Sequence, residues 1–205
     1  MKRNIILTFF IVVCIAILIP GCTSTGQAAK STGGKTADDM ADFEWDGSTA
    51  LTLQDVYFYD DVTNGGSSSL IRGEYTEDGV FIMEGTVTAK LSYGFLGGGL
   101  AVKGDNKNLL SIAKGIKFMT KGDGKKYRIR IESRKVKDFD MHGYVFTAPS
   151  TETEITVLYK DLKQEGWGSN VSFNPKDVFQ ISFQTVGQPH DSISLKAWNF
   201  EIIPE

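Results

Sequence analysis

The sequence of 205 residues is poor in cysteine and histidine. Its two cysteines, Cys14 and Cys22, both lie near the N-terminus, and its histidines are His142 and His190. A disulfide framework and a cysteine-ligated metal site are therefore excluded after Cys22. HExxH and GxSxG motifs and closely spaced histidine pairs are absent, so we expect no enzyme active site. Paired carboxylates for glycoside hydrolysis stay open, because their separation is spatial.

The chain also lacks an excess of positive charge and a long apolar run. Its formal net charge is −3, which gives no overall attraction to nucleic acid, so we expect no nucleic-acid partner. The apolar run at 5–19 is shorter than the roughly 20 residues that a membrane-spanning helix needs. It follows Lys2 and Arg3, and this order is typical of a secretory signal peptide.

Gly21 and Cys22 follow the apolar run directly, in the sequence LIPGC. This segment resembles the lipobox of bacterial lipoproteins, in which the cysteine is lipidated and becomes the new N-terminus. The resemblance implies a signal peptide over 1–21, a lipid anchor on Cys22 and a place on a membrane of the bacterial cell envelope. A plain secretory signal and an uncleaved anchor are the alternatives.

Residues 22–41 are small, polar and without an apolar period, and we interpret them as a flexible tether. The composition changes at Phe43 and Trp45, and residues 42–205 have the length of one domain. Apolar and polar residues then alternate in short runs, which predicts β-strands. The runs are YRIRIES (127–133), EITVLY (154–159), VFQISF (178–183) and SISLKAW (192–198).

Turn signals separate these runs, at TEDG (76–79), GGG (97–99), GDG (122–124) and PST (149–151). The pattern predicts a mostly-β fold, an antiparallel sandwich or barrel. In VFQISF we expect Phe179, Ile181 and Phe183 to face inward. The strongest short helix candidate is NLLSIAKGI (108–116).

Five longer segments carry a resemblance to known proteins. They are YDDVTNGGSSS (59–69), FIMEGTVTAKLSYGFLGGG (81–99), GIKFMTKGDGKKYRIRI (115–131), YVFTAPSTETEITVLYKDLKQ (144–164) and DVFQISFQT (177–185). In this order they resemble the complex I intermediate-associated protein 30 (CIA30) family and, more loosely, family 11 carbohydrate-binding modules. The resemblance implies a jelly-roll sandwich of the galactose-binding-domain type that binds a carbohydrate or glycoconjugate without catalysis.

Two segments bear on a metal ion. Where the resembling modules often carry an aspartate that helps to hold a structural calcium, this chain has LKAWNFEI (195–202), so a calcium is not favoured and we expect no cofactor. The segment DDVTNGGSSS (60–69) offers Asp60, Asp61 and Asn64 but lacks the EF-hand spacing. We interpret it as a structural loop.

The resemblance places the ligand on a sheet face that carries aromatic rings, arginine and acidic groups. Rings pack on the C–H faces of sugars, and charged groups form paired hydrogen bonds with hydroxyls. The alternation predicts that Arg128, Arg130 and Glu132 form one row of candidate binding residues. Asp140, His142 and Tyr144 would form the neighbouring row. Trp167, between two glycines, is expected in a loop. The alternatives are a solvated charged face, a protein-interaction or assembly module, and a surface adhesin.

Overall fold

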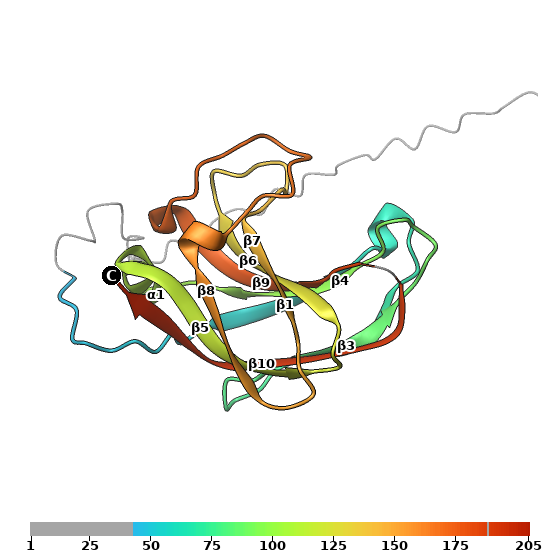
Figure 1. The fold of residues 1–205 in the computed structure, drawn as a ribbon, viewed down its shortest axis with the longest axis horizontal. Coiled ribbons are helices and arrows are strands. Elements are labelled where there is room, and N and C mark those ends of the chain that lie inside the picture. Colours follow the sequence, from blue (N-terminus) through green and yellow to red (C-terminus); the bar gives the residue numbers. More distant parts are fainter. Residues whose placement is uncertain (1–42, 188) are drawn as a thin grey trace, which may run out of the picture. The chain divides into compact units, whose positions relative to one another are not determined.

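The structure, a computed structural model, describes residues 43–187 and 189–205. The predictions for the signal peptide, Cys22 and the tether lie outside these residues. The described residues form ten strands, one short α-helix and three 3-10 turns (Figure 1). The strands are β1 (Gln54–Asp60), β2 (Ser69–Tyr75), β3 (Phe81–Val87), β4 (Leu96–Ala101), β5 (Ala113–Gly122), β6 (Lys126–Ser133), β7 (Gly143–Thr147), β8 (Thr153–Leu158), β9 (Val178–Thr185) and β10 (His190–Pro204). The helical elements are η2 (Val62–Asn64), α1 (Asp105–Ser111), η3 (Tyr159–Asp161) and η4 (Pro175–Asp177).

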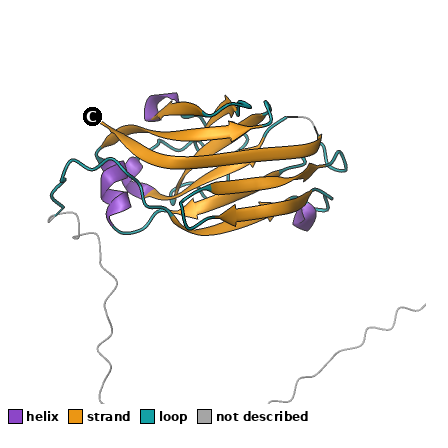
Figure 2. Ribbon diagram, turned by 90° about the horizontal axis from the view of Figure 1, so that it is seen from below, coloured by secondary structure: helices purple, strands orange, loops and turns teal. Residues whose placement is uncertain are grey.

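The strands pair into two antiparallel sheets of five strands each. The first sheet has the order β1-β4-β9-β6-β7, and the second sheet has the order β2-β3-β10-β5-β8. Figure 2 shows that strands dominate the fold and that the helical turns lie at its periphery. The predicted mostly-β antiparallel sandwich is therefore confirmed.

The hydrophobic core lies between the two sheets. In β6 the inward residues Tyr127, Ile129 and Ile131 are fully buried, as their alternation predicts. An aromatic cluster joins the sheets, because Phe118 of β5 packs against Phe183 of β9 with ring centroids 5.4 Å apart. Burial of each such side chain stabilises the fold by about 1.5–3 kcal/mol.

One local prediction was wrong and two were right only in part. GGG (97–99) is part of β4 and not a turn. The helix ends at Ser111, and the apolar alternation after it belongs to β5, where Ile116 is fully buried in the core. Phe179 does not share the inward side of Phe183, because the β6–β9 register shifts between Glu132 and Ser133. Val178 occupies the buried position, and Phe179 is only half-buried.

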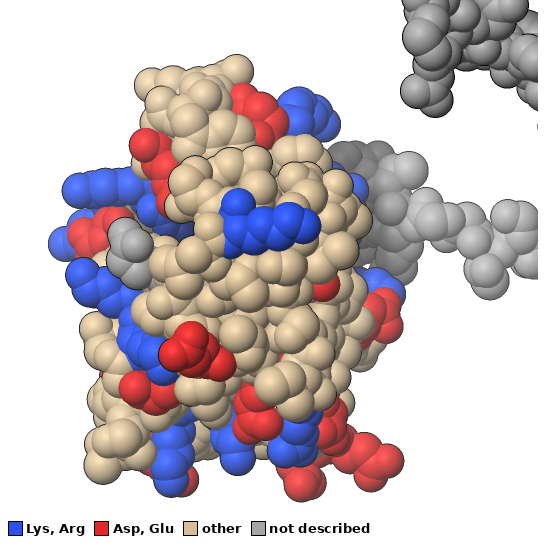
Figure 3. Space-filling view, turned by 90° about the vertical axis from the view of Figure 1, so that its right-hand side faces the viewer, with Lys and Arg blue, Asp and Glu red and all other residues tan. Residues whose placement is uncertain are grey.

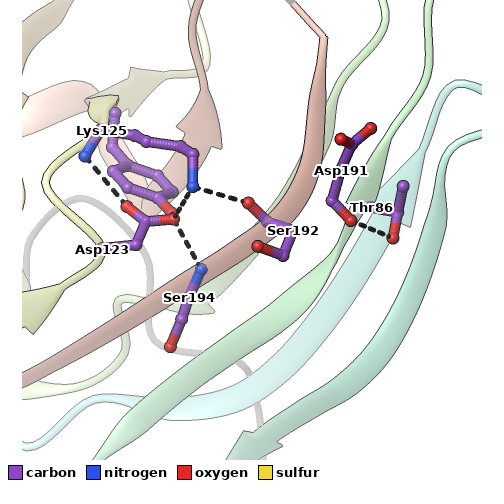
Figure 4. Close-up of polar contacts among 7 residues, drawn as sticks. Thr86, Asp123, Lys125, Asp191, Ser192 and Ser194 are labelled. Atoms are coloured by element: carbon purple, nitrogen blue, oxygen red, sulfur yellow. Dashed lines mark hydrogen bonds and ion pairs between the residues drawn. The ribbon is translucent and has the colours of Figure 1, made fainter.

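The turn between β5 and β6 carries the chain from the second sheet to the first, and Asp123 fixes this crossing (Figure 4). Its Oδ2 accepts hydrogen bonds from the backbone N–H of Ser194 in β10 at 2.9 Å and from the Tyr127 hydroxyl in β6 at 3.0 Å. Lys125 donates to the same carboxylate through its backbone N–H and its Nζ. One carboxylate thus ties both sheets to the turn, which Gly124 completes with a φ of 79°.

Replacement of this carboxylate should change how stability depends on pH. Burial alone would raise the pKa of Asp123, but the hydrogen bonds from Ser194, Lys125 and Tyr127 outweigh it, and the pKa lies below its usual value. Its stabilisation is therefore complete above the unfolded-state pKa of about 3.9 and is lost as the pH falls through the folded-state pKa. Asp123→Asn should lower the free energy of unfolding at pH 7 by about 1–3 kcal/mol. The free energy of unfolding of the variant should also fall less steeply in acid than that of the wild type. Urea unfolding at a series of pH values measures both effects. Asp78→Asn, in an exposed turn, is the matched control. Identical pH profiles for the two variants would contradict the role of Asp123.

Candidate functional site

The face of the first sheet that points away from the core is built from cross-strand rows. Arg128, Arg130 and Glu132 lie together on this outer face, on alternate positions of β6. The first row runs through Tyr57, Gly99, Ser182, Arg130 and Gly143, the second through Tyr59, Gly97, Gln184, Arg128 and Val145, and the third through Ala101, Gln180 and Glu132. The outer face therefore combines tyrosines at one edge with charged side chains near the other.

Two tyrosine rings of β1 lie directly over glycines of β4. A Cβ atom at Gly97 would sit 2.3 Å from Cζ of Tyr59, and one at Gly99 would sit 2.7 Å from Cε1 of Tyr57. No real Cβ atom tolerates such distances, so both positions must be glycine for the rings to lie on the strand. The two rings stack with centroids 5.8 Å apart and planes at 27°. Gly97 and Gly99 thus leave room for the two tyrosine rings, which together form an aromatic surface on the strand.

These rings form one wall of a hollow on the outer face, with a volume of about 360 Å³. We name it the tyrosine hollow. It is lined by Tyr57, Tyr59, Arg130, Glu132, Phe139, Met141 and Phe179. Its volume is within the usual range of small-molecule sites, roughly 300–1,000 Å³.

The rim of the tyrosine hollow presents two aromatic rings to solvent. Tyr57 is 43% exposed and Phe139 is 72% exposed. Phe139 has a φ of 65°, in the left-handed region that costs a bulky residue about 1–3 kcal/mol. The backbone around it is held by the hydrogen bond from the Met141 N–H to the Phe139 carbonyl, at 2.8 Å. The loop between β6 and β7 therefore holds an apolar ring out in water at a conformational cost, which is a feature of binding sites.

Polar groups with unused hydrogen-bonding capacity lie at the floor of the tyrosine hollow. The Nε of Arg130 is buried and has no hydrogen-bond partner among the described residues. The buried hydroxyl of Tyr59 makes no hydrogen bond of good geometry there either, although Arg130 and Ser182 lie close enough to influence its pKa. Buried polar groups are nearly always paired in native proteins, so these atoms point to a partner from outside the chain.

Glu132 is the acidic group of the tyrosine hollow. Burial raises the pKa of its carboxyl, while hydrogen bonding from Ser182 and the charge of Arg130 act in the opposite direction. Burial also raises the pKa of Tyr57, whose hydroxyl accepts a hydrogen bond from the Gln180 amide. Glu132 and Arg130 have opposite charge, so the floor of the hollow is close to neutral when the carboxyl is ionised.

The structure does not bring Asp140, His142 and Tyr144 onto the outer face. Strand β7 begins at Gly143, so Asp140 and His142 lie in the loop before it. Tyr144 pairs with the buried Ile129, which places its ring on the core side. The predicted second row is therefore separate from the row of Arg128, Arg130 and Glu132. The alternation of 140, 142 and 144 had no strand to support it before residue 143.

Asp140 anchors the loop that carries Trp167. Its carboxylate accepts hydrogen bonds from the backbone N–H groups of Glu165 at 2.7 Å, Gly166 at 2.9 Å and Gly168 at 3.1 Å. Burial alone would raise the pKa of Asp140, but these three bonds lower it below its usual value. Figure 1 shows the β6–β7 loop and the loop after η3 rising side by side above β6 and β7. Asp140 is therefore the structural link between the two loops.

Trp167 lies at the exposed end of this second loop. Its side chain is 59% exposed, and its indole N–H donates to Glu165 at 3.1 Å. Glu165 also forms an ion pair with Arg128 on the outer face, with Nη1 and Oε1 2.9 Å apart. Trp167 is thus connected to the outer face through one ion pair, although it does not line the tyrosine hollow.

The segment predicted to be a structural loop, DDVTNGGSSS, centres on Asp61. This aspartate is fully buried and accepts hydrogen bonds from the N–H and hydroxyl of Ser68 and from the Phe95 N–H. A Cβ at Gly66 would overlap the same carboxylate. Its bonding capacity is thus used within the protein. Residues 43–187 and 189–205 contain no group of three or more metal-binding side chains placed to hold an ion.

Two further observations concern the surface charge and the helices of the described residues. Figure 3 shows acidic and basic side chains interspersed on the face that it views, without a field of one sign. Within the part of the chain that the structure describes, no helix has the length and apolar character to cross a membrane.

Sequence reasoning missed five residues of the tyrosine hollow. Three of them had no readable signal, since Phe139 and Met141 lie in a loop and Phe179 is displaced by the register shift. Tyr57 and Tyr59 had a readable signal, because they alternate with Phe58 and the glycine run 97–99 follows later in the sequence. The five residues are Tyr57, Tyr59, Phe139, Met141 and Phe179.

Comparison with known proteins gives structural neighbours among carbohydrate-binding modules. The family 11 module of a cellulosomal cellulase of Clostridium thermocellum superposes with a TM-score of 0.54 at 16% identity, covering 78% of this chain and 95% of the module. A family 11 module from the same organism, in complex with a β-1,3-1,4-mixed-linked tetrasaccharide, gives a TM-score of 0.50 at 16% identity, covering 77% of this chain and 98% of the module. At such identities the likeness shows a shared fold.

Sequence comparison identifies a relative and a family. Endoglucanase 3 of Fibrobacter succinogenes is 30% identical over 163 residues, which is 71% of this chain and 24% of the endoglucanase. The chain therefore spans about a quarter of that enzyme. The model of the complex I intermediate-associated protein 30 family matches residues 43–197, which are most of the chain. The matched range contains all of β1–β9 and the first part of β10. The protein thus belongs to the complex I intermediate-associated protein 30 (CIA30) family.

Proposed function

We propose that the protein binds a neutral carbohydrate in the tyrosine hollow and does not catalyse its hydrolysis. The observation that carries this proposal is the pairing of exposed rings with unpaired polar atoms. Tyr57 and Phe139 offer flat apolar surfaces to the C–H faces of a sugar ring. The Arg130 Nε and the Tyr59 hydroxyl offer hydrogen bonds to its hydroxyl groups.

The charges of the outer face favour a neutral ligand. Arg128 is neutralised by Glu165, and Arg130 lies beside Glu132 on the same strand face. An acidic sugar would meet no surplus cation there, and it would lose the hydration of its carboxylate on entering the hollow. A neutral sugar needs only the hydrogen bonds that the hollow leaves unused.

The carboxylates of the tyrosine hollow favour binding over hydrolysis. Most glycoside hydrolases use two carboxyl groups that flank the scissile bond. Glu132 is the only carboxylate among the described residues that line the hollow. The fold shared with family 11 modules, one of them in complex with a tetrasaccharide, supports the same interpretation. The sequence similarity to a part of an endoglucanase also supports carbohydrate binding.

We further propose that the protein is exported and held on a bacterial membrane through a lipid on Cys22. The support is the order of basic segment, apolar segment, glycine and cysteine at the N-terminus. Two or three acyl chains on one cysteine would give stable anchoring, whereas a single chain binds membranes only marginally. A carbohydrate-binding domain on such an anchor would hold a polysaccharide at the cell surface or in the periplasm.

Substitutions in the tyrosine hollow should separate binding from stability. Tyr57→Ala removes a stacking surface and Arg130→Ala removes hydrogen-bond donors, so each should weaken binding by about 1–3 kcal/mol, or about 5- to 150-fold. The measurement is isothermal titration with the β-1,3-1,4-mixed-linked tetrasaccharide, or with the strongest ligand on a glycan array. The full-length protein is used in a detergent that carries no sugar headgroup.

Two controls match these substitutions. Tyr93→Ala removes a tyrosine that is 60% exposed elsewhere, and Arg72→Ala removes an exposed arginine of the second sheet. Both should leave affinity unchanged, and all four variants should melt close to the wild type. If Tyr57→Ala and Arg130→Ala bind the ligand as tightly as the two controls, the tyrosine hollow is not the binding site.

The lipid anchor has a separate test. Cys22→Ser removes the thiol that would be acylated, so the variant should accumulate as the unprocessed precursor and lose its partition into the detergent phase of Triton X-114. Cys14→Ser, within the apolar segment, is the matched control and should be processed normally. A Cys22→Ser protein with the same N-terminal mass and the same partition as the wild type would show that Cys22 carries no lipid.

A further inference from the structure

A second cavity lies beneath the loop after η3, at the β7 edge of the first sheet. Its volume is about 530 Å³, and it shares no lining residue with the tyrosine hollow. We name it the loop pocket. The residues of its wall that bear on its chemistry are Asp140, His142, Lys163, Gln164, Gly166 and Asn170.

The wall of the loop pocket is held in place by internal hydrogen bonds. The Asp140 carboxylate accepts three backbone N–H groups from residues 165–168, as described above. The Gln164 amide donates to the carbonyls of Asp140 at 2.7 Å and Ser169 at 3.0 Å, and its oxygen accepts from the Val171 N–H at 2.8 Å. Both side chains are therefore committed to the wall, and the cavity is preformed.

Other groups of the wall are not committed. The His142 side chain is 5% exposed, and its Nδ1 is buried without a hydrogen bond of good geometry among the described residues, although the Val171 backbone lies close enough to influence its pKa. Burial lowers the pKa of His142, so the ring is neutral at neutral pH. Lys163 forms no ion pair with any residue that the structure describes. The buried Nδ1 of His142, the Lys163 ammonium and the Asn170 amide thus belong to the lining of one preformed cavity.

An exposed aromatic ring lies on the loop that bounds the loop pocket. Gly166 and Gly168 both line the cavity, and Trp167 between them is 59% exposed. Gly166 has a φ of 90°, and a Cβ at Gly168 would lie 2.7 Å from the Asp138 carboxylate. The two glycines therefore fix the turn that presents the indole. Glu165 holds the ring through the indole N–H.

The local charges select among ligand classes. Backbone N–H groups lower the pKa of Asp138, and hydrogen bonds lower that of Asp140 despite its burial, so both are ionised at neutral pH. One lysine beside two carboxylates does not make an anion site. A ligand with many hydroxyls and an apolar face suits the indole, the imidazole nitrogen, the ammonium and the amide together.

We propose that the loop pocket is a second carbohydrate site, which takes a sugar either as a free monosaccharide or as the end of a chain. It extends the proposed function, but it stands on residues that the tyrosine hollow does not use. Both cavities are open to solvent, and the loop pocket is the larger of the two, about 530 Å³ against about 360 Å³. The protein would thus have two carbohydrate-binding sites.

The test follows the indole N–H signals of the three tryptophans by ¹H–¹⁵N NMR, with ¹⁵N-tryptophan in the full-length protein. The probes are the methyl glycosides of glucose, galactose, mannose and N-acetylglucosamine, and the mixed-linked tetrasaccharide. We expect one or more methyl glycosides to shift the Trp167 signal saturably while the Trp45 signal stays in place. A shift with the tetrasaccharide as well would assign the pocket to chain ends, and a shift with a methyl glycoside alone would assign it to free monosaccharides.

Variants decide which site responds. Lys163→Ala should raise the Kd for the methyl glycoside about five- to tenfold, and Trp167→Ala should do the same, followed by calorimetry. Trp45→Ala, which removes another exposed tryptophan, is the matched control and should leave the Kd unchanged. Tyr57→Ala should leave the saturable shift of the Trp167 signal unchanged, because that ring belongs to the tyrosine hollow.

The two proposals fail in different ways. The loop pocket is refuted if no probe shifts the Trp167 signal at saturation, or if Tyr57→Ala abolishes the shift. It is supported even if the tetrasaccharide never binds the tyrosine hollow, provided that a methyl glycoside shifts Trp167 and Lys163→Ala weakens that binding. Loss of tetrasaccharide binding in Tyr57→Ala with an unaltered Trp167 response would support both proposals.

Discussion

The outer face of the first sheet depends on a close approach between two tyrosine rings and two glycines. Tyr57 and Tyr59 lie where Cβ atoms of β4 would otherwise be, at Gly99 and Gly97. A side chain at either position would displace the ring, because its Cβ would lie 2.3 Å from Cζ of Tyr59 or 2.7 Å from Cε1 of Tyr57. The hollow that we assign to a carbohydrate exists because these positions carry no side chain.

Buried carboxylates act as anchors for the loops of this sandwich. Asp61, Asp123 and Asp140 each accept three or more hydrogen bonds, and at least one donor to each carboxylate is distant in sequence. Two of them lie in the segments DDVTNGGSSS and KGDGKKY, which carry much of the family resemblance. These segments therefore report how the sandwich is closed, and they do not line the tyrosine hollow. Other parts of the resembling segments do reach the tyrosine hollow, through Tyr59, Arg130 and Phe179.

The two proposed sites are linked by the Arg128–Glu165 ion pair. Arg128 belongs to the outer face, and Glu165 belongs to the loop that presents Trp167. This pair holds the loop against the sheet and neutralises one arginine of the face. It is only partly shielded from water, so its contribution to stability is modest. Its main consequence is geometric, since it fixes the distance between the sheet surface and the indole.

The sequence by itself determined the fold class and the two sides of β6. Alternation in YRIRIES was enough to bury Tyr127, Ile129 and Ile131 and to place Arg128, Arg130 and Glu132 on the outer face, because side chains of a strand alternate with a period of two. The tertiary structure alone decided what stands beside these charges. Tyr57 comes to lie on the same face across two intervening strands, β4 and β9, Phe139 through a strained loop, and Phe179 through a register shift. Strand order, loop conformation and bulges are long-range properties of the packed sheets, so a local period cannot encode them.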